Sequence, residues 1–249
     1  MVDHDSEVGG DIMAGALAYR LFVWLLPFAL VVVAGLGFAA DAESTSPAKA
    51  ARSVGLAGVV SSSVASAARS PTRWYALLIG VPILLYVTRS FLRALIVTHR
   101  LVWSESRGAA PRPTARATLL LLVAMTAYFL VPALGAAARS AWPDIGILAN
   151  LVVAVPYAAL WLLVSSRLPH RNSGWRALLP GAVLFGLGIE ALHIVTAYVI
   201  APQVSSREGT YGSLGVAAAL LLGLFLASRL VVASAVLNAT LYERHTTAR

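Results

Sequence analysis

AGALAYRLFVWLLPFALVVVAGLGFAA, residues 14–40, is an apolar run long enough to cross a lipid bilayer as one helix. About 20 apolar residues in a helix span the hydrocarbon core of a membrane. Five more such stretches follow, separated by short gaps. We therefore predict an all-α polytopic integral membrane protein, a six-helix transmembrane bundle that forms a single membrane domain over residues 1–249. The predicted spans are about 14–40, 74–98, 115–138, 145–165, 178–200 and 213–240.

The composition points to lipid as the natural solvent of the chain. Hydrophobic residues make up 59% of the sequence and charged residues 12%, with a mean hydropathy of +0.78. Soluble domains carry about 25% charged residues. There is no cysteine, which excludes disulfides and thiolate chemistry. HExxH, Walker A and GxSxG patterns are missing as well, so we expect no enzyme, no cofactor and no bound metal.

The chain is strongly basic, with a formal net charge of +8. Such a charge is typical of partners that are nucleic acids or anionic lipids, although heavy arginine and alanine use is also what a GC-rich genome produces. The basic segments lack the interleaved aromatic residues of nucleic-acid-binding modules. We therefore expect membrane lipids, anionic ones in particular, as partners and no nucleic acid. Whether the chain forms a homo-oligomer stays open.

Arginine placement predicts the orientation, because cytoplasmic loops are enriched in Lys and Arg. The second and fourth loops and the C-terminal tail carry most of the loop arginines, which places both termini in the cytoplasm. The first loop, about 41–73, is an exception with four basic residues. Its apolar positions fit either a short surface helix or a flexible loop.

Ionisable side chains inside a span cost about 2.5–3.5 kcal/mol on insertion scales and therefore mark candidate sites. Arg89 and Arg93 lie four residues apart in the second span and share one helix face. Their guanidinium groups suit a phosphate or carboxylate. The alternative is that Arg93 extends to the headgroups by itself. Arg229, in the last span, is a further candidate for binding the same anion.

Glu190 is the acidic candidate, near the middle of the fifth span. Ala182 and Gly186 share its helix face, and small residues allow another helix to approach closely. We therefore expect Glu190 to face the bundle interior, with Arg89 or Arg229 as its partner. The alternative is an ion pair that only fixes packing.

Two segments resemble the YihY/BrkB membrane-protein family. Residues 14–27, AGALAYRLFVWLLP, are similar to that family's A-x-x-L-A-Y-Y stretch leading to Leu-Pro, and they contain Tyr19 and Pro27. Arg20 stands where the family has a second tyrosine. Residues 211–215, YGSLG, resemble the family's signature, and a closing L-N-A follows at 237–239. The motif residues of this last span are Tyr211, Gly212, Gly215 and Asn238.

The resemblance implies six spans in a bacterial cytoplasmic membrane, and family members have been linked to transport of lipids or envelope precursors. From the residues we expect a transporter or flippase of an anionic amphiphile, a phospholipid or a lipid-linked envelope precursor. In this hypothesis Arg89, Arg93 and Arg229 hold the headgroup, and Glu190 competes for them in the empty state. The alternative is a structural or scaffolding membrane protein without transport activity. An intramembrane enzyme ranks last.

Overall fold

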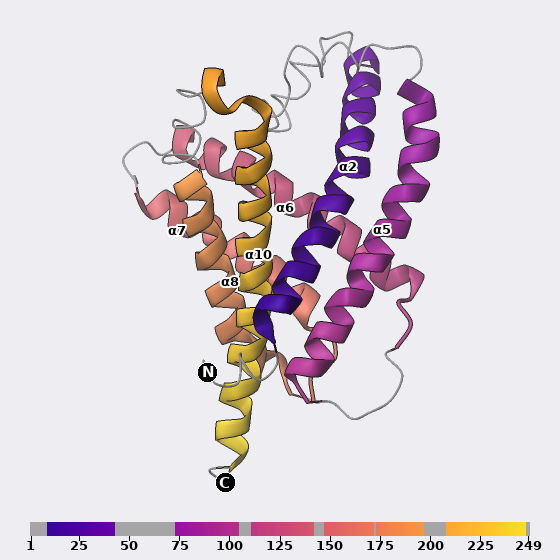
Figure 1. Ribbon diagram of the computed structural model, residues 1–249. Helices are drawn as coiled ribbons and strands as arrows, with labels where there is room; N and C mark the ends of the chain where they lie inside the picture. The colour runs from indigo at the N-terminus through magenta and orange to yellow at the C-terminus, as the bar shows by residue number, and fades with distance from the viewer. Residues whose placement is uncertain are drawn as a thin grey trace.

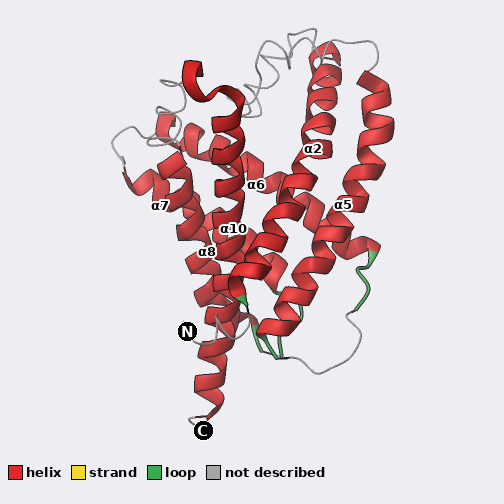
Figure 2. Ribbon diagram, viewed as in Figure 1, coloured by secondary structure: helices red, strands yellow, loops and turns green. Residues whose placement is uncertain are grey.

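The computed structural model describes residues 9–42, 73–104, 111–141, 147–171, 173–196 and 208–247. Figure 2 shows that these residues are helical apart from a few short loop segments. The prediction of an all-α bundle is confirmed. The helices are α2 (Gly10–Ala42), α5 (Arg73–Val102), α6 (Ala115–Ala141), α7 (Ile147–Ser165), α8 (Trp175–Val195) and α10 (Glu208–Thr247).

Length and composition make these helices suited to a membrane. Five of them are long and apolar enough to cross a bilayer, and α7 has a shorter apolar part, Val153–Ser165. Large apolar side chains cover the outer surface, including Ile12 at 80% exposed and Val123 at 67%. Apolar surface of this extent is unfavourable in water and favourable in lipid. The chain is therefore a multi-pass membrane protein.

The six helices pack as a closed ring. Each contacts the next along the chain, from α2 to α5, α6, α7, α8 and α10, and α10 packs back against α2. Figure 1 shows the first turn of α2 and the last turn of α10 at the same end of the bundle. A chain that crosses the bundle an even number of times in alternating directions begins and ends on the same side.

Two glycines of α8 let its neighbours approach closely. A methyl group at Gly181 would collide with the carbonyl oxygen of Ser234 in α10. On the other side, a methyl at Gly186 would lie 2.6 Å from the carbonyl oxygen of Ala154 in α7. The expected small face of this helix is confirmed, because Ala182, Gly186 and Glu190 are all buried.

The ends of the helices agree with the predicted spans to within a few residues, except at α10. That helix begins at Glu208 and continues to Thr247, whereas the predicted span was about 213–240. The last turns carry Arg244 and His245, so hydropathy alone does not detect them. The first loop, for which the sequence left two alternatives, lies mostly outside the described residues.

Candidate functional site

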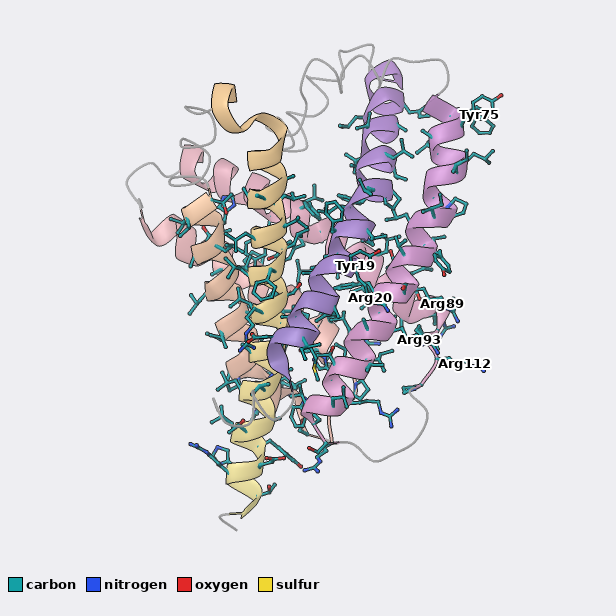
Figure 3. The ribbon with its side chains drawn as sticks, in the orientation of Figure 1. Tyr19, Arg20, Tyr75, Arg89, Arg93 and Arg112 are labelled. Carbon is teal, nitrogen blue, oxygen red and sulfur yellow. The ribbon has the colours of Figure 1, made fainter. Side chains whose placement is uncertain are left out.

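A group of three arginines lies on the paired helices α2 and α5. Arg89 and Arg93 are both exposed, one turn apart on the outer face of α5. Arg20 of α2 is half-buried and donates hydrogen bonds to the carbonyl oxygen of Ser90, at 3.1 Å, and to its hydroxyl. Figure 3 shows the three side chains at similar heights along the two helices. We call Arg20, Arg89 and Arg93 the arginine cluster.

The depth of the arginine cluster follows from the aromatic residues at the other end of α5. Trp74 and Tyr75 are exposed there, as aromatic residues are at a membrane–water boundary. Arg89 lies about 21 Å along the helix from Tyr75 and Arg93 about 27 Å. The hydrocarbon core is about 30 Å thick. Arg93 thus lies about 3 Å from the opposite boundary, and Arg89 lies about 9 Å inside it.

The surroundings of the arginine cluster combine cationic and apolar surface. Toward Tyr75, the exposed face of α5 presents Leu78, Ile79, Ile83 and Tyr86. Guanidinium groups donate several hydrogen bonds in a planar fork that fits phosphate oxygens. The arrangement suits an anionic headgroup whose hydrocarbon chains lie along the apolar part of the same face.

The expected partner of Glu190 is not Arg89. Glu190 of α8 is only 4% exposed, whereas Arg89 lies on the outer face of α5. Hydropathy gives the depth of an arginine in a span but not the direction in which it points. Arg229 forms an ion pair with Asp11 in the first turn of α2, at 3.0 Å between Nε and Oδ1. The pairing of Glu190 with Arg229 stays a prediction, and the structure does not gather Arg229 or Glu190 into the arginine cluster.

Glu190 lies instead among aromatic side chains of α6 and α7. Its carboxyl group lies close to the phenol groups of Tyr128 and Tyr157. The rings of these two tyrosines are 4.5 Å apart. In the described part of the chain there is no group of three or more His, Asp or Glu side chains able to hold a metal ion. Glu190 thus contributes to a buried polar cluster with two tyrosines.

All six helices contribute to the wall of a cavity of about 160 Å³ that is partly open to the outside of the bundle. Aliphatic and aromatic side chains line it, and no charged residue is among the described residues that do so. The arginine cluster lies on the outside of two of the helices that form the cavity wall. Representative lining residues, one from each helix in chain order, are Trp24, Phe91, Tyr128, Trp161, Phe185 and Val231.

Hydrogen bonds between side chains tie pairs of helices together around this cavity. The indole N–H of Trp24 donates to the hydroxyl of Thr88 at 2.8 Å, which joins α2 to α5. The indole N–H of Trp161 donates to the hydroxyl of Ser234 at 2.9 Å, which joins α7 to α10. Interhelical hydrogen bonds of this kind fix the rotation of membrane helices about their axes.

The motif residues fall in different surroundings. Tyr19 is 68% exposed on the outside of α2, and Pro27 is buried within the same helix. Asn238 is buried between α10 and α8. Tyr211, Gly212 and Gly215 lie in the first turns of α10, and their side chains are outside the described part.

Arg20 is the functional candidate that the sequence reasoning missed. It stands six residues inside the first predicted span, about 14–40. An ionisable residue within a span is a sufficient signal by itself. The depth of Arg20 in its span is comparable to the depths of Arg89 and Arg93 in theirs, so the same criterion selects it.

Comparison with known proteins identifies the family of the chain. The model of the family described as Virulence factor BrkB matches residues 3–249. No curated protein and no solved structure gives a significant match. The family match spans nearly the whole sequence and includes both segments whose motifs resembled that family. This multi-pass membrane protein belongs to the BrkB family.

Proposed function

We propose that the protein transports an anionic amphiphile, a phospholipid or a lipid-linked envelope precursor, across the bacterial cytoplasmic membrane. The observation that supports this most is the arginine cluster. Arg89 and Arg93 lie one turn apart at the edge of an otherwise apolar outer face, and Arg20 of α2 is hydrogen-bonded to Ser90, which follows Arg89 (Figure 3). With both termini in the cytoplasm, the cluster lies at the inner leaflet, where anionic headgroups are abundant. The proposal assigns no enzymatic reaction to the protein.

In this proposal the headgroup binds to Arg89 and Arg93, and Arg20 supports them from α2. Arg20 already donates to Ser90, the residue that follows Arg89, so its guanidinium lies next to the headgroup position. The lipid chains pack along the exposed apolar side chains of α5. Arg229, which pairs with Asp11, acts in closing α10 against α2 rather than in headgroup binding. This changes the role expected for it from the sequence.

A scaffolding function is the second candidate, and the hydrogen bonds between helices favour it. Trp24–Thr88 joins α2 to its ring neighbour α5, and Trp161–Ser234 joins α7 to α10, which are separated in the ring by α8. A bundle fixed in this way is suited to holding partner proteins in the membrane without moving a substrate. In that case the arginine cluster only anchors the protein to anionic headgroups.

Reconstitution into vesicles tests the proposed transport. A fluorescent phosphatidylglycerol is placed in one leaflet, and its appearance in the other is followed by chemical quenching. We expect the wild-type protein to move it faster than protein-free vesicles do. We expect the Arg89→Ala/Arg93→Ala variant to lose this activity. The control variant Arg167→Ala/Arg176→Ala loses the same charge at exposed positions elsewhere and should stay active.

The outcomes of this experiment separate the two candidates. Wild-type protein that binds phosphatidylglycerol without moving it contradicts transport of this lipid and favours a scaffold. Equal loss of activity in both double variants shows that net charge, rather than the arginine cluster, is responsible.

A further inference from the structure

The outer side of α5 carries four polar side chains spread along the helix, namely Tyr75, Tyr86, Arg89 and Arg93. All four are exposed. With about 100° between successive residues of a helix, they lie within an arc of about 60°. Figure 3 shows Tyr75, Arg89 and Arg93 on the same side of α5. We call these four residues the polar stripe.

The polar stripe extends from one membrane boundary past the middle of the bilayer. Tyr86 lies about 16.5 Å along the helix from Tyr75. The hydrocarbon core is about 30 Å thick, so Tyr86 lies near its midplane. It is nevertheless 74% exposed, whereas tyrosines on the surface of membrane proteins are enriched at the membrane–water interfaces. A hydrogen-bonding group is therefore presented to lipid at a depth where water is scarce.

Pro82 adds a backbone acceptor between Tyr75 and Tyr86. It is exposed, lies within α5 and falls inside the arc of the polar stripe. Proline has no N–H, so the carbonyl of Leu78, four residues earlier, lacks its usual helical donor. On the outer side of a helix, such a carbonyl can accept a hydrogen bond from water or from a hydroxyl group of a lipid headgroup.

The interior of the bundle offers no comparable path for a headgroup. The cavity between the helices measures about 160 Å³, and the described residues that line it include no charged side chain. An apolar cavity of this size accommodates a benzene-sized molecule, which is smaller than a phospholipid headgroup. A charged group in apolar surroundings needs hydrogen-bond partners, and the polar stripe supplies them on the outside of the bundle.

The charge of α5 suits an anionic headgroup along the whole polar stripe. Residues 73–104 contain no Asp or Glu, so no carboxylate of this segment repels a phosphate. Guanidinium N–H groups and phenol O–H groups both donate hydrogen bonds to phosphate oxygens. Along the helix, Tyr86 lies about 4.5 Å from Arg89, which lies about 6 Å from Arg93. A phosphate can therefore pass from one donor to the next in short steps.

We propose that the polar stripe is the route of the headgroup across the membrane, on the outside of the bundle, with Tyr86 as its binding position at the midplane. This inference rests on the proposed function and adds the path to it. The phosphate leaves Arg89, accepts a hydrogen bond from the Tyr86 hydroxyl and continues to the boundary at Tyr75, while the acyl chains stay in the surrounding lipid. Tyr86 lowers the barrier because a polar group without partners in hydrocarbon is unfavourable.

Tyr86→Phe in the vesicle assay tests the position at the midplane. The change removes one hydroxyl from an exposed side chain, so the protein should fold normally. We expect fluorescent phosphatidylglycerol to cross about two- to tenfold more slowly, the range for one hydrogen bond. Retention of this lipid by the arginine cluster, measured by native mass spectrometry, should not change. Tyr19→Phe removes an exposed hydroxyl from α2, outside the polar stripe, and should keep the wild-type rate.

Ile79→Ser tests the route by adding a polar group to it. Ile79 is 56% exposed and lies between Tyr75 and Tyr86, within about 20° of the arc of the polar stripe. A hydroxyl there shortens the longest interval between polar side chains, so lipid should cross several-fold faster. Val155→Ser makes a similar change at an exposed position of α7 and should leave the rate unchanged.

The outcomes distinguish the route from the proposed function. Wild-type rates in both Tyr86→Phe and Ile79→Ser overturn the route and leave the proposed function intact. Ala124→Leu and Ala227→Leu narrow the cavity, and the proposal expects folded protein of both variants to transport normally. Loss of transport in these two variants, with no effect of the α5 variants, would place the route inside the bundle. Wild-type protein that moves no lipid contradicts the proposed function and the route with it.

Discussion

Asn238 of α10 holds the backbone of α8 at Gly181. Its side-chain oxygen accepts a hydrogen bond from the Gly181 N–H at 2.7 Å, and its amide nitrogen donates to the Leu178 carbonyl at 3.2 Å. Gly181 makes this possible, because a larger residue would collide with α10. One asparagine thus satisfies two backbone groups beside Pro180, whose ring lacks an N–H.

The first prediction concerns this asparagine. Asn238→Ala should lower the free energy of unfolding by about 1–2 kcal/mol, because two buried interhelical hydrogen bonds are lost. Thr240→Ala is the control, since the Thr240 hydroxyl bonds only to Val236 of its own helix. Unfolding in mixed micelles measures both variants. Equal stabilities of the two would show that Asn238 does not join α8 to α10.

The second prediction concerns the contact between α8 and α7. Gly186→Leu should destabilise the bundle by at least about 1–3 kcal/mol, because a side chain there meets the backbone of α7 at Ala154. Gly223→Leu introduces the same side chain where no atom lies within 4 Å of the added carbon. Thermal melting in detergent should separate the two variants clearly. A Gly186→Leu protein as stable as wild type would mean that this face contacts lipid.

The third prediction is that Arg89 and Glu190 contribute independently to the stability of the protein. Because Arg89 is exposed and Glu190 is buried in a different helix, Arg89→Ala should change the unfolding free energy by less than about 0.5 kcal/mol. The effects of Arg89→Ala and Glu190→Gln should add in the double variant, as they do for distant sites. A double-mutant cycle measures this. A coupling energy above about 1 kcal/mol would instead show that the two charges interact.

The fourth prediction concerns orientation. α2 begins and α10 ends on the same side of the bundle (Figure 1), and the arginine-rich loops place that side in the cytoplasm. A reporter enzyme that is active only outside the cytoplasm should be inactive when fused after Arg249. The same reporter should be active when inserted within residues 44–70. The opposite pattern would reverse the orientation and move the arginine cluster to the outer leaflet.

Hydropathy sufficed to predict the six helices, because each membrane span must satisfy its own backbone hydrogen bonds. The small face of α8 was also readable from the spacing of Ala182, Gly186 and Glu190. The outward direction of the Arg89 side chain could not be predicted from the sequence, since the rotation of a helix about its axis depends on its neighbours. Contacts such as that of Arg20 with Ser90 join residues far apart in the chain, and only the packing of α2 on α5 brings them together.

The cavity between the helices could likewise not be predicted from the sequence. Each lining residue is an ordinary hydrophobic residue of its own helix, and the cavity results from how the helices fit together. The same holds for Asn238, whose motif position was recognised but whose contact with Gly181 was not. The sequence of one helix gives the type of a residue and its depth in the membrane. Which residue it contacts on another helix depends on how the helices pack against one another.

Headgroup recognition by the arginine cluster is the central claim, and native mass spectrometry tests it most directly. Protein is released from nanodiscs that contain equal amounts of phosphatidylglycerol and phosphatidylcholine, and the bound lipids are counted. We predict that wild-type protein and Arg167→Ala/Arg176→Ala retain phosphatidylglycerol preferentially, whereas Arg89→Ala/Arg93→Ala retains the two lipids equally. Loss of two charge-assisted contacts should weaken binding by about tenfold or more. An undiminished preference for phosphatidylglycerol in Arg89→Ala/Arg93→Ala would contradict the claim.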